Sequence, residues 1–508
     1  MNNPWHHFRK TDSVILGSIT ERQNRWLMAC LSNNQNSAYG MRYGFSTIAS
    51  IEEFQRQVPI VEYETLAPWI DNIANGIDEQ LFCTSVVAFE KTGGSHSGGK
   101  LIPYTAHGLA DFRHGLIGWL NSVITQFELT EGKAYWALSP AATHTDTTNS
   151  GIPIGAGDAL YLGEENLTMF AELSAVPLSL SMVKDMAHWQ LLTLYFLIRC
   201  QDLRLISIWS PSFLSSLLTA LHEKQHTLLM LLTQGGIVAD HSLCADADAL
   251  RRYQDYLAQN NTHILWPQLK VISCWADASS QPLARVLMNH FPNVALQPKG
   301  LLSTEAIITV PDTHDNPCLC IDSNFYEFID DNGEVFLASE VRPNDEYRVI
   351  ITTNSGLYRY QTGDRVKCIS RQQNGVSLRF IGRSGVCSDL VGEKLTEPFV
   401  IHCLNKLEGF AALAPDTTRL GYVLLLDEQY RQQNQPWLSG VELQLHSNPQ
   451  YAYARRLSQL HPLRYTFIEQ PIERYLRWQY DKGKKLGDIK PPALLPHDSW
   501  RDIFQIQG

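Results

Sequence analysis

The sequence has no long hydrophobic run. A membrane-spanning helix needs about 18 consecutive apolar residues, and the nearest candidates, Leu191–Ile198 and Leu228–Leu232, are short and bounded by polar residues. The first ten residues are polar, with Trp5, His6 and His7, and lack the apolar core of a signal peptide. We therefore expect a protein with no membrane span and no export signal, located in the cytoplasm.

Positive charge is also scarce. Lysine and arginine number 41 against 52 aspartates and glutamates, which gives a formal net charge of −11. Proteins that coat nucleic acids or bind membranes through basic patches need a cationic face. The balance excludes both classes and leaves room only for a local basic pocket, such as a phosphate site.

The ten cysteines form no Cys-x-x-Cys pair, and Cys318 and Cys320 are the only close couple. A disulfide framework or a zinc ribbon would show regular spacing. In a reducing cytosol these residues are expected to be small buried hydrophobic side chains.

The composition is that of an ordinary globular protein, with 44% hydrophobic and 18% charged residues among 508. Apolar residues at steps of three and four predict helices, and short β-branched or aromatic runs predict strands. The predicted helices are Ser18–Ser32, Ala106–Phe127, Lys184–Cys200, Pro211–Gln234 and Asp246–Asn260. The predicted strands are Lys270–Trp275, Ala306–Val310, Tyr347–Thr353, Arg365–Ile369 and Val376–Ile381.

Helices and strands alternate through the first 300 residues or so, which predicts an α/β fold. After about Cys318 the pattern becomes rich in strands. A domain boundary is expected near Gly382–Gly392, followed by a small α+β domain. The tail from Pro491 onward is predicted to be irregular.

The most informative segment is a glycine-rich loop, residues 90–100, which reads EKTGGSHSGGK. Glycine backbone N–H groups, hydroxyls and a lysine together describe a phosphate cradle. Gly94 and Gly99-Lys100 match the spacing of a nucleotide-hydrolase P-loop, but Leu101 stands where a serine or threonine should bind Mg²⁺. Pro103 also interrupts the helix that should follow. A flexible surface loop remains an alternative for this segment alone.

A second motif, His222-Glu223-Lys224-Gln225-His226, is a literal H-E-x-x-H. On one helix face two histidines could bind zinc. Lys224 and Gln225 favour the solvated side of an amphipathic helix instead.

Two further segments carry polar groups next to glycine. Gly300–Ala306 contains Ser303, Thr304 and Glu305, which could serve phosphate and Mg²⁺ or could cap a helix. In the segment 356–364, Asp364 follows Gly363 and could bind ribose hydroxyls or be a turn residue.

In this order and spacing, the segments resemble the acyl-acid amido synthetases of the Gretchen Hagen 3 family, auxin-responsive proteins with bacterial relatives in the adenylate-forming superfamily. The resemblance begins near Phe54 and covers most of the chain. Its more specific parts are Leu357–Asp364 and Glu393–Glu397, and the glycine loop is a looser match. Other matching segments are Thr92–Thr105, Ser303–Glu305, Phe325–Phe328, Phe380–Arg383 and Gly487–Pro492.

The resemblance implies a large N-terminal α/β adenylate-forming domain with sheets and flanking helices, residues 1–382, and a small mobile α+β C-terminal domain, residues 383–508. It implies an ATP-dependent ligase. A carboxylic acid reacts with Mg-ATP to give an acyl-adenylate and pyrophosphate, and an amine, typically an amino acid, then forms an amide and releases AMP. ATP and Mg²⁺ are the expected cofactors, and small-molecule acids and amines are the expected partners.

The resemblance also assigns roles to residues. Lys100, Thr304 and Lys490 are expected to act in catalysis, with Lys490 stabilising negative charge during adenylation. Glu305 is expected to bind Mg²⁺. The expected nucleotide contacts are Ser95, His96, Ser97, Gly98, Ser303, Tyr358, Asp364 and Arg383.

Some features depart from the family pattern or stay open. Gly93 and His96 replace hydroxyl residues that are common in the loop, which leaves a weakened or repurposed adenylation site open. Trp119, Leu120 and Trp209 are candidates for the acyl pocket, although aromatic residues at helical spacing are more often core. A thiol acceptor, or a binding protein without turnover, is the alternative function. The sequence does not specify the acid, the amine or the oligomeric state.

Overall fold

The computed structural model describes most of the chain, in segments separated by short gaps. They are residues 4–9, 17–91, 100–137, 146–155, 161, 163–432, 436–495 and 497–506. The chain forms two compact units, each assembled from segments distant in sequence. The first unit comprises residues 1–132, 143–174 and 298–380, and the second comprises residues 133–142, 175–297 and 381–508.

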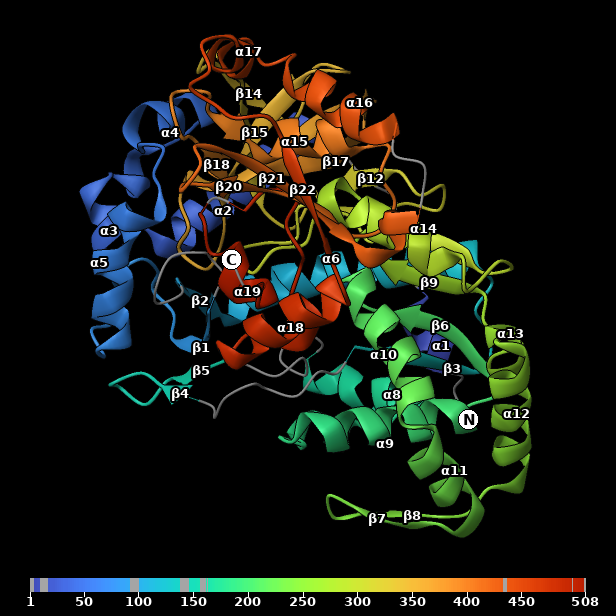
Figure 1. Ribbon diagram of the computed structural model, residues 1–508. Helices are drawn as coiled ribbons and strands as arrows, with labels where there is room; N and C mark the ends of the chain where they lie inside the picture. Colours follow the sequence, from blue (N-terminus) through green and yellow to red (C-terminus); the bar gives the residue numbers. More distant parts are fainter. Residues whose placement is uncertain are drawn as a thin grey trace. The chain divides into compact units, whose positions relative to one another are not determined.

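The largest sheet of the first unit has seven strands in the order β11-β12-β17-β16-β15-β13-β14. Figure 1 labels β12, β14, β15 and β17 of this sheet. The pairs β12–β17, β13–β15 and β15–β16 are antiparallel. Buried and half-buried residues alternate along β16, as expected for a strand with one face on the core. The strands are Thr309–Pro311 (β11), Pro317–Leu319 (β12), Phe325–Ile329 (β13), Val335–Leu337 (β14), Glu346–Thr352 (β15), Tyr360–Arg371 (β16) and Val376–Arg383 (β17).

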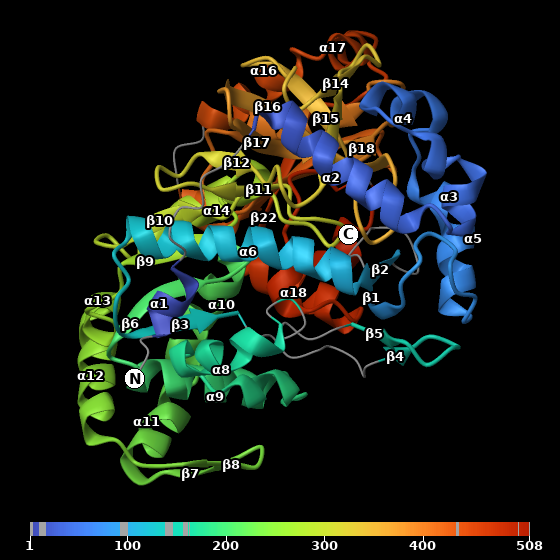
Figure 2. The ribbon, with the colours of Figure 1, turned by 180° about the vertical axis from the view of Figure 1, so that it is seen from behind.

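Helix α2 (Ile19–Asn34) crosses this sheet and packs against β13 (Figure 2). It begins with a capping box, in which the Ser18 hydroxyl accepts from the Glu21 N–H and the Glu21 carboxylate accepts from the Ser18 N–H. The other helices of this unit are α1 (Pro4–Phe8), α3 (Ala38–Arg42), η1 (Phe45–Thr47), α4 (Ile51–Gln57), α5 (Tyr63–Ala74), α6 (Ala106–Gln126) and α8 (Glu164–Leu173).

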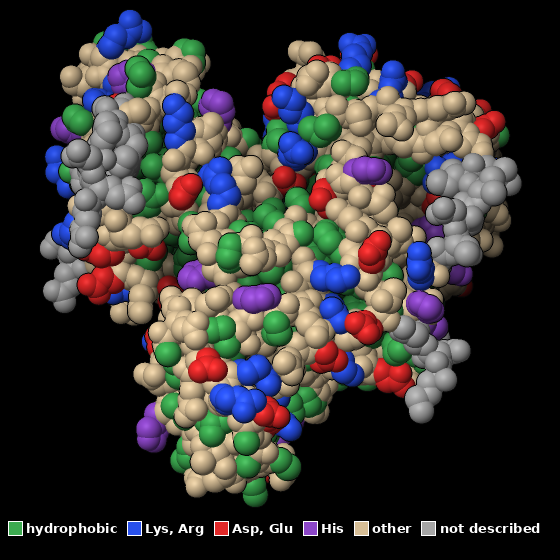
Figure 3. Space-filling view, turned by 90° about the vertical axis from the view of Figure 1, so that its right-hand side faces the viewer, with side chains coloured by type: hydrophobic (Ala, Val, Ile, Leu, Met, Phe, Trp, Pro, Cys, Tyr) green, Lys and Arg blue, Asp and Glu red, His purple; other side chains and the backbone are tan. Residues whose placement is uncertain are grey.

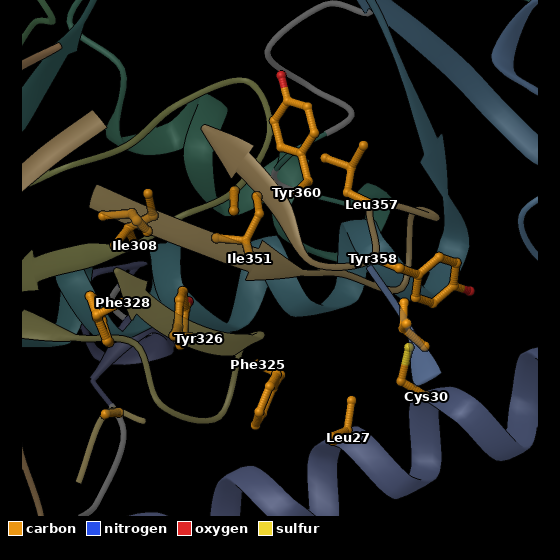
Figure 4. Close-up of a cluster of buried hydrophobic side chains, with 14 of the residues drawn as sticks. Leu27, Cys30, Ile308, Phe325, Tyr326, Phe328, Ile351, Leu357, Tyr358 and Tyr360 are labelled. Atoms are coloured by element: carbon orange, nitrogen blue, oxygen red, sulfur yellow. The ribbon is translucent and has the colours of Figure 1, made fainter. Parts of the chain in front are cut away.

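The core of the first unit lies between α2 and the sheet. Figure 4 shows Leu27 and Cys30 of α2 pointing toward Phe325 and Tyr326 of β13 and toward Tyr358. Leu27 and Cys30 are three residues apart, so one helix face carries both. Each such buried side chain stabilises the fold by roughly 1.5–3 kcal/mol relative to an exposed one.

A smaller sheet of the first unit has the order β2-β1-β5-β4. Strand β1 pairs antiparallel with β2 and, through Phe89, parallel with β5. The strands are Val86–Lys91 (β1), Leu101–Thr105 (β2), Asp146–Thr147 (β4) and Pro153–Ile154 (β5).

The second unit contains a four-stranded sheet in the order β10-β9-β6-β3, in which β3–β6 and β6–β9 are parallel. Every residue of β9 is buried, as in parallel sheets covered on both faces. The strands are Lys133–Trp136 (β3), Leu203–Ser207 (β6), Val271–Cys274 (β9) and Ala295–Pro298 (β10). Around it in sequence lie η2 (Leu178–Met182), α9 (Met186–Arg199), α10 (Pro211–Glu223), α11 (Gln225–Gln234), the hairpin β7 (Gly236–Val238) and β8 (His241–Leu243), α12 (Ala247–Gln259), α13 (Thr262–Leu265), η3 (Ala278–Ser280) and α14 (Gln281–Met288).

The C-terminal part of the second unit has its own three-stranded sheet, in which β21 lies between β20 and β22. Its strands are Ala411–Asp416 (β20), Gly421–Asp427 (β21) and Arg464–Ile468 (β22), and a hairpin of Cys387–Ser388 (β18) and Leu395–Thr396 (β19) precedes them. The helices are α15 (Glu397–Leu404), η4 (Glu428–Gln432), α16 (Pro436–Leu445), α17 (Pro449–Arg456), α18 (Pro471–Asp481), η5 (Leu486–Asp488) and α19 (Trp500–Phe504).

The mixed α/β fold confirms the predicted class, and α2, α6, α9 and α12 confirm four of the predicted helices. The fifth, Pro211–Gln234, is helical but not continuous, because Lys224 separates α10 from α11. The tail is also more ordered than predicted. Residues 493–495 pair with β20, and the Trp500 indole of α19 donates to the Pro415 carbonyl at 3.0 Å.

The predicted domain boundary at Gly382 lies within β17, two residues after the break between the units at 380 and 381. Residues 175–297 belong to the same unit as residues 381–508. The division into domains 1–382 and 383–508 stays a prediction.

Within the described residues, no helix combines the length and the apolar character that a membrane span requires. On the face shown in Figure 3, lysine and arginine side chains are interspersed with aspartate and glutamate.

A buried ion pair joins Arg359, just before β16, to Glu327 of β13. The two side chains are 6% and 1% exposed, and Arg359 Nη2 lies 2.8 Å from Glu327 Oε1. Arg359 Nη1 also donates to the carbonyls of Gln55 at 2.7 Å and Val58 at 2.8 Å. These contacts assign Arg359 an internal, structural role.

We expect Arg359→Met to destabilise the first unit by about 3–5 kcal/mol, because it leaves the Glu327 carboxylate buried without its partner. Chemical denaturation followed by fluorescence measures the change. The matched control is Arg365→Met, since Arg365 pairs with Asp331, which is 71% exposed, and such pairs contribute about 1 kcal/mol or less. Equal small effects of the two substitutions would contradict a structural role for the buried pair.

Candidate active site

Residues 303–306 form a tight turn. The Ser303 N–H donates to the Ala306 carbonyl at 3.0 Å, and the Ser303 hydroxyl accepts from the Ala306 N–H at 3.3 Å. A bridge between Leu302 and Ile307 closes the turn, which places Thr304 and Glu305 at its tip. No helix follows in the described residues 307–352, so the helix-cap alternative is wrong.

Two contacts fix this turn on neighbouring strands. The Tyr104 hydroxyl of β2 donates to the Thr304 carbonyl at 2.6 Å. Gly300 has φ of 83°, and a Cβ there would lie 2.4 Å from the Thr309 carbonyl oxygen. Only glycine fits this close approach, so the chain can return tightly on itself and hold the turn in one place.

Glu305 is 8% exposed, and the residue before it in the chain, Thr304, carries a hydroxyl group. Carboxylate and hydroxyl oxygens are hard donors of the kind that Mg²⁺ prefers, and Mg²⁺ commonly keeps only one or two carboxylate ligands together with substrate phosphates. The residues of the turn are therefore of a kind that fits Mg²⁺, and the assignment of Glu305 as its protein ligand stays a prediction.

The glycine-rich loop connects two antiparallel strands. Lys91, the last residue of β1, pairs with Leu101, the first residue of β2. A P-loop instead runs from a strand directly into a helix, so the structure confirms that this segment is not a P-loop. Residues 92–99 lie outside the described part of the chain. This segment contains Gly93 and the predicted phosphate ligands Ser95, His96, Ser97 and Gly98.

Lys100 stands at the end of this loop, and its ammonium lies 5.1 Å from the centre of the Tyr63 ring. The Tyr63 hydroxyl accepts from the Leu101 N–H at 2.9 Å. The tyrosine thus attracts the lysine cation through its ring and fixes the start of β2 through its hydroxyl.

Asp364 lies in a bulge of β16. Opposite it, β15 pairs Ile350 with Gln361 and Arg348 with Arg365, so three residues of β16 face Val349 alone. Gly363 has φ of 81°, which allows the bulge. The Asp364 N–H donates to the Thr362 hydroxyl at 3.1 Å, and Asp364 is 4% exposed.

Tyr358 belongs to the core. Its side chain is fully buried, its ring stacks on Tyr39 at 5.2 Å, and its hydroxyl donates to the Leu81 carbonyl at 2.8 Å. Burial raises the pKa of Tyr358 well above its usual value. This geometry gives the side chain a structural role in the core, and the nucleotide contact of Tyr358 stays a prediction.

Arg383 and Lys490 belong to the second unit. Arg383 ends β17 and is exposed. Lys490 precedes an extended strap whose Ala493 carbonyl accepts from the Leu413 N–H of β20 at 2.8 Å. The Ala493 N–H donates to the Glu397 carboxylate at 3.2 Å, which fixes the strap to α15. The roles of both residues stay predictions.

The aromatic candidates for the acyl pocket are mostly core. Trp119 and Leu120 are 3% and 2% exposed. Trp209, in the second unit, is half-buried, and its ring lies 5.8 Å from that of Trp275.

Two residues near the turn were not found by sequence reasoning. Tyr104 fixes Thr304, as described above. Lys299 is buried, and its ammonium lies 4.3 Å from the Trp119 ring. Tyr104 lies in the matching segment Thr92–Thr105, but no role was predicted for it. Lys299 directly precedes Gly300 and could have been noticed for that reason.

The H-E-x-x-H motif does not form a zinc site in this fold. The helix break at Lys224 separates His222 from His226, so the two histidines do not share a continuous helix. His222 Nε2 instead lies 3.0 Å from the Tyr256 hydroxyl. The described residues contain no cluster of three or more potential metal ligands from histidine, cysteine, aspartate and glutamate.

Sequence relatives are amido synthetases of plants. The chain is 23% identical over 434 residues to "Indole-3-acetic acid-amido synthetase GH3.15" of Arabidopsis thaliana, covering 75% of this chain and 70% of that protein. It is 23% identical over 443 residues to "Probable indole-3-acetic acid-amido synthetase GH3.11" of Oryza sativa subsp. japonica, covering 76% and 72%.

Solved structures share the fold. The structure described as "AtGH3.15 acyl acid amido synthetase in complex with 2,4-DB" has a TM-score of 0.84 at 16% identity, covering 96% of this chain and 93% of that one. A 2-hydroxyisobutyryl-CoA ligase in complex with 2-HIB-AMP has a TM-score of 0.56 at 11% identity, covering 99% and 98%.

Family models match along most of the chain. The model of the GH3 family N-terminal domain matches residues 16–296, and that of the GH3 family central domain matches residues 318–383. The resemblance inferred from the residue motifs is thereby confirmed. Since the N-terminal match alone spans more than half of the sequence, this chain belongs to the GH3 family.

Proposed function

We propose that this protein is an ATP-dependent ligase that joins a carboxylic acid to an amine through an acyl-adenylate. In the first step the acid carboxylate attacks the α-phosphate of ATP, and pyrophosphate leaves. In the second step the neutral amine attacks the acyl carbon, and AMP leaves. The amine is proposed to be an amino acid, as the names of the plant relatives suggest.

The observation that carries the proposal is the pair of rigid supports for Glu305 and Asp364 in the first unit. Both residues are almost fully buried. Glu305 lies in a turn that follows Gly300, and Asp364 lies in a bulge next to Gly363, and both glycines have positive φ. Buried carboxylates held by special backbone conformations are typical of functional sites rather than of packing. In the proposed site, the Glu305 carboxylate binds Mg²⁺ and the Asp364 carboxylate binds the ribose hydroxyls.

The proposed chemistry depends on charge and positioning. Adenylyl transfer needs neutralisation of phosphate charge and in-line placement of the acid, with no nucleophile from the protein. Lys100 supplies one cation at the end of the glycine-rich loop, and Lys490 supplies another. Mg²⁺ bound at Glu305 would neutralise further phosphate charge.

The remaining residues of the proposed site are proposed to contact the nucleotide itself. Asp364 accepts hydrogen bonds from the ribose hydroxyls, and Ser303 and Thr304 contact the adenylate from the turn. Arg383 contacts the nucleotide near the end of β17. In the second step the adenylate is already activated, so the protein needs only to place the amine.

We also propose a cytoplasmic location. All ten cysteines are free, which suits a reducing compartment, and the reaction consumes ATP.

The first experiment is ATP–pyrophosphate exchange with Mg²⁺ across a panel of aryl, indolic and fatty acids. We expect exchange that depends on one class of acid, because the first step is reversible. AMP release with amino acids or with coenzyme A then identifies the acceptor. Tight ATP binding without exchange for any acid would favour a binding protein, and AMP release with coenzyme A alone would favour the thiol acceptor.

We expect Asp364→Ala to reduce adenylation at least about tenfold, equivalent to about 1.4 kcal/mol of transition-state stabilisation. The loss should appear mainly in the KM for ATP, because ribose contacts are present in the ground state as well. Steady-state exchange kinetics measure it. Asp248→Ala, on the exposed face of α12, is the control. Unchanged exchange kinetics of Asp364→Ala would disprove the ribose assignment.

We expect Lys490→Ala to slow adenylation at least about tenfold and to leave amide formation from a synthetic acyl-adenylate intact. The lysine is proposed to stabilise charge only in the first step. Comparison of exchange with single-turnover amide formation separates the two steps, with exposed Lys406→Ala as the control. Full exchange activity of Lys490→Ala would show that another cation performs this role.

A further inference from the structure

Asp111, on α6 of the first unit, lies against the loop that joins β15 to β16. Asn354 of this loop donates from Nδ2 to Asp111 Oδ2 at 2.7 Å. The Trp26 side chain of α2 is a second hydrogen-bonding neighbour of the carboxyl group. The contacts therefore join three elements that are distant in sequence.

The surroundings of Asp111 disfavour its charge. Burial raises the pKa of Asp111 to about 7. The other titratable groups that interact with it are Cys30 of α2 and Tyr326 of β13, and burial raises the pKa of both, so they stay neutral. No lysine or arginine in the described part of the chain pairs with Asp111. On α6 itself, His107 and His114 lie one helical turn before and after it.

The partner of Asp111 has an unsatisfied atom. Asn354 Oδ1 is buried and has no hydrogen-bond donor among the described residues. A buried acceptor without a donor destabilises a fold by about 1–3 kcal/mol. The amide already meets the carboxyl group through its N–H, and a carboxylic acid presents one acceptor and one O–H donor side by side. A protonated Asp111 would satisfy this oxygen.

We propose that Asp111 is held as a carboxylic acid that pairs edge to edge with the Asn354 amide through two hydrogen bonds, and that this pair is a positioning contact for the ATP site. One bond is the observed N–H donation to Oδ2. In the other, the acid O–H at Oδ1 donates to Asn354 Oδ1. The positioning role at the ATP site rests on the proposed function, whereas the existence of the acid–amide pair does not.

The loop that the pair holds is close-packed on the start of α6. The Thr105 hydroxyl donates to the Asn354 carbonyl at 2.9 Å. A Cβ on Gly108 would lie 2.0 Å from Ser355 Oγ, so a larger residue there would force the Ser355 hydroxyl to move. These contacts join the loop and the first two turns of α6 into one closely packed body.

This body connects two segments proposed to bind ATP. On one side α6 follows directly from β2, which begins next to Lys100. On the other side the loop leads into the β16 bulge that carries Asp364. The pair thus sets the spacing between a phosphate contact and the ribose contact, although Asp111 itself touches neither.

Infrared spectroscopy tests the pair directly, without any need for activity. We expect a carboxylic acid C=O band that disappears as the pH rises through about 7 in the wild-type protein and is absent in Asp111→Asn. Asp111→Asn keeps two amide–amide hydrogen bonds and has no titrating group, so it is the matched variant. If the spectra of the wild type and of Asp111→Asn are identical in the carboxylic acid C=O region from pH 5 to about 9, the acid–amide pair is overturned.

Stability supplies a second readout with a defined sign. The folded-state pKa is raised above the ordinary value of 3.8, so the stabilisation is complete at acid pH and is lost as the pH rises from about 4 to about 7. We expect Asp111→Asn to gain stability relative to the wild type across this window. A constant difference between the two proteins would count against the pair.

The positioning role is tested by the KM for ATP in pyrophosphate exchange. We expect the wild-type KM for ATP to rise as the pH rises through about 7. The KM of Asp111→Asn should not change with pH and should stay near the wild-type value at low pH. The KM of Asp111→Leu should be about tenfold higher than that value, with little change in kcat. If Asp111→Leu does not fold, the contrast between wild type and Asp111→Asn still decides the matter. Identical pH profiles of these two would disprove positioning. Absence of exchange in every protein, with the infrared band present, would disprove the proposed function alone.

Discussion

The buried pair of Arg359 and Glu327 is the contact on which the site of the first unit depends. Arg359 is in the left-handed region at φ of 48°, and its guanidinium binds Glu327 and two carbonyls near the end of α4. Moving either charge would leave the other buried without a partner, at several kcal/mol. Backbone hydrogen bonds of Val61 with Arg359 and Gln361 fix the same point from a further segment. The bulge that presents Asp364 therefore starts from a fixed position.

The glycine-rich loop shows how one sequence pattern can serve two architectures. In a P-loop the following helix directs its N-terminal dipole at the phosphates. Here β2 intervenes, and α6 begins only at Ala106. A phosphate held by this loop would therefore depend on loop backbone groups, on Lys100 and on a metal at Glu305. This arrangement makes the Ser303–Ala306 turn as important to the proposed site as the loop itself.

The proposed site is supported by polar contacts outside the residues that would touch ATP. Tyr104 holds the Thr304 carbonyl, the Thr362 hydroxyl holds the Asp364 backbone, and Asn354 holds the loop before β16. Each support comes from a neighbouring strand, bulge or helix, so the functional side chains lie on rigid elements. Such supports limit the motion of groups that must be placed within fractions of an ångström.

Local sequence determined the regular elements and the family. The apolar spacing of Ile19–Asn34 and Ala106–Gln126 and the motif around Leu357–Asp364 are visible in one dimension, because helix periodicity and glycine turns are local properties. The tertiary structure alone decided that Arg359 pairs internally, that the Tyr358 ring serves the core, and that Lys224 divides two helices. It also brought Asp111 to Asn354, 243 residues away. Burial and partnership depend on segments that meet only after folding, so no local pattern could specify them.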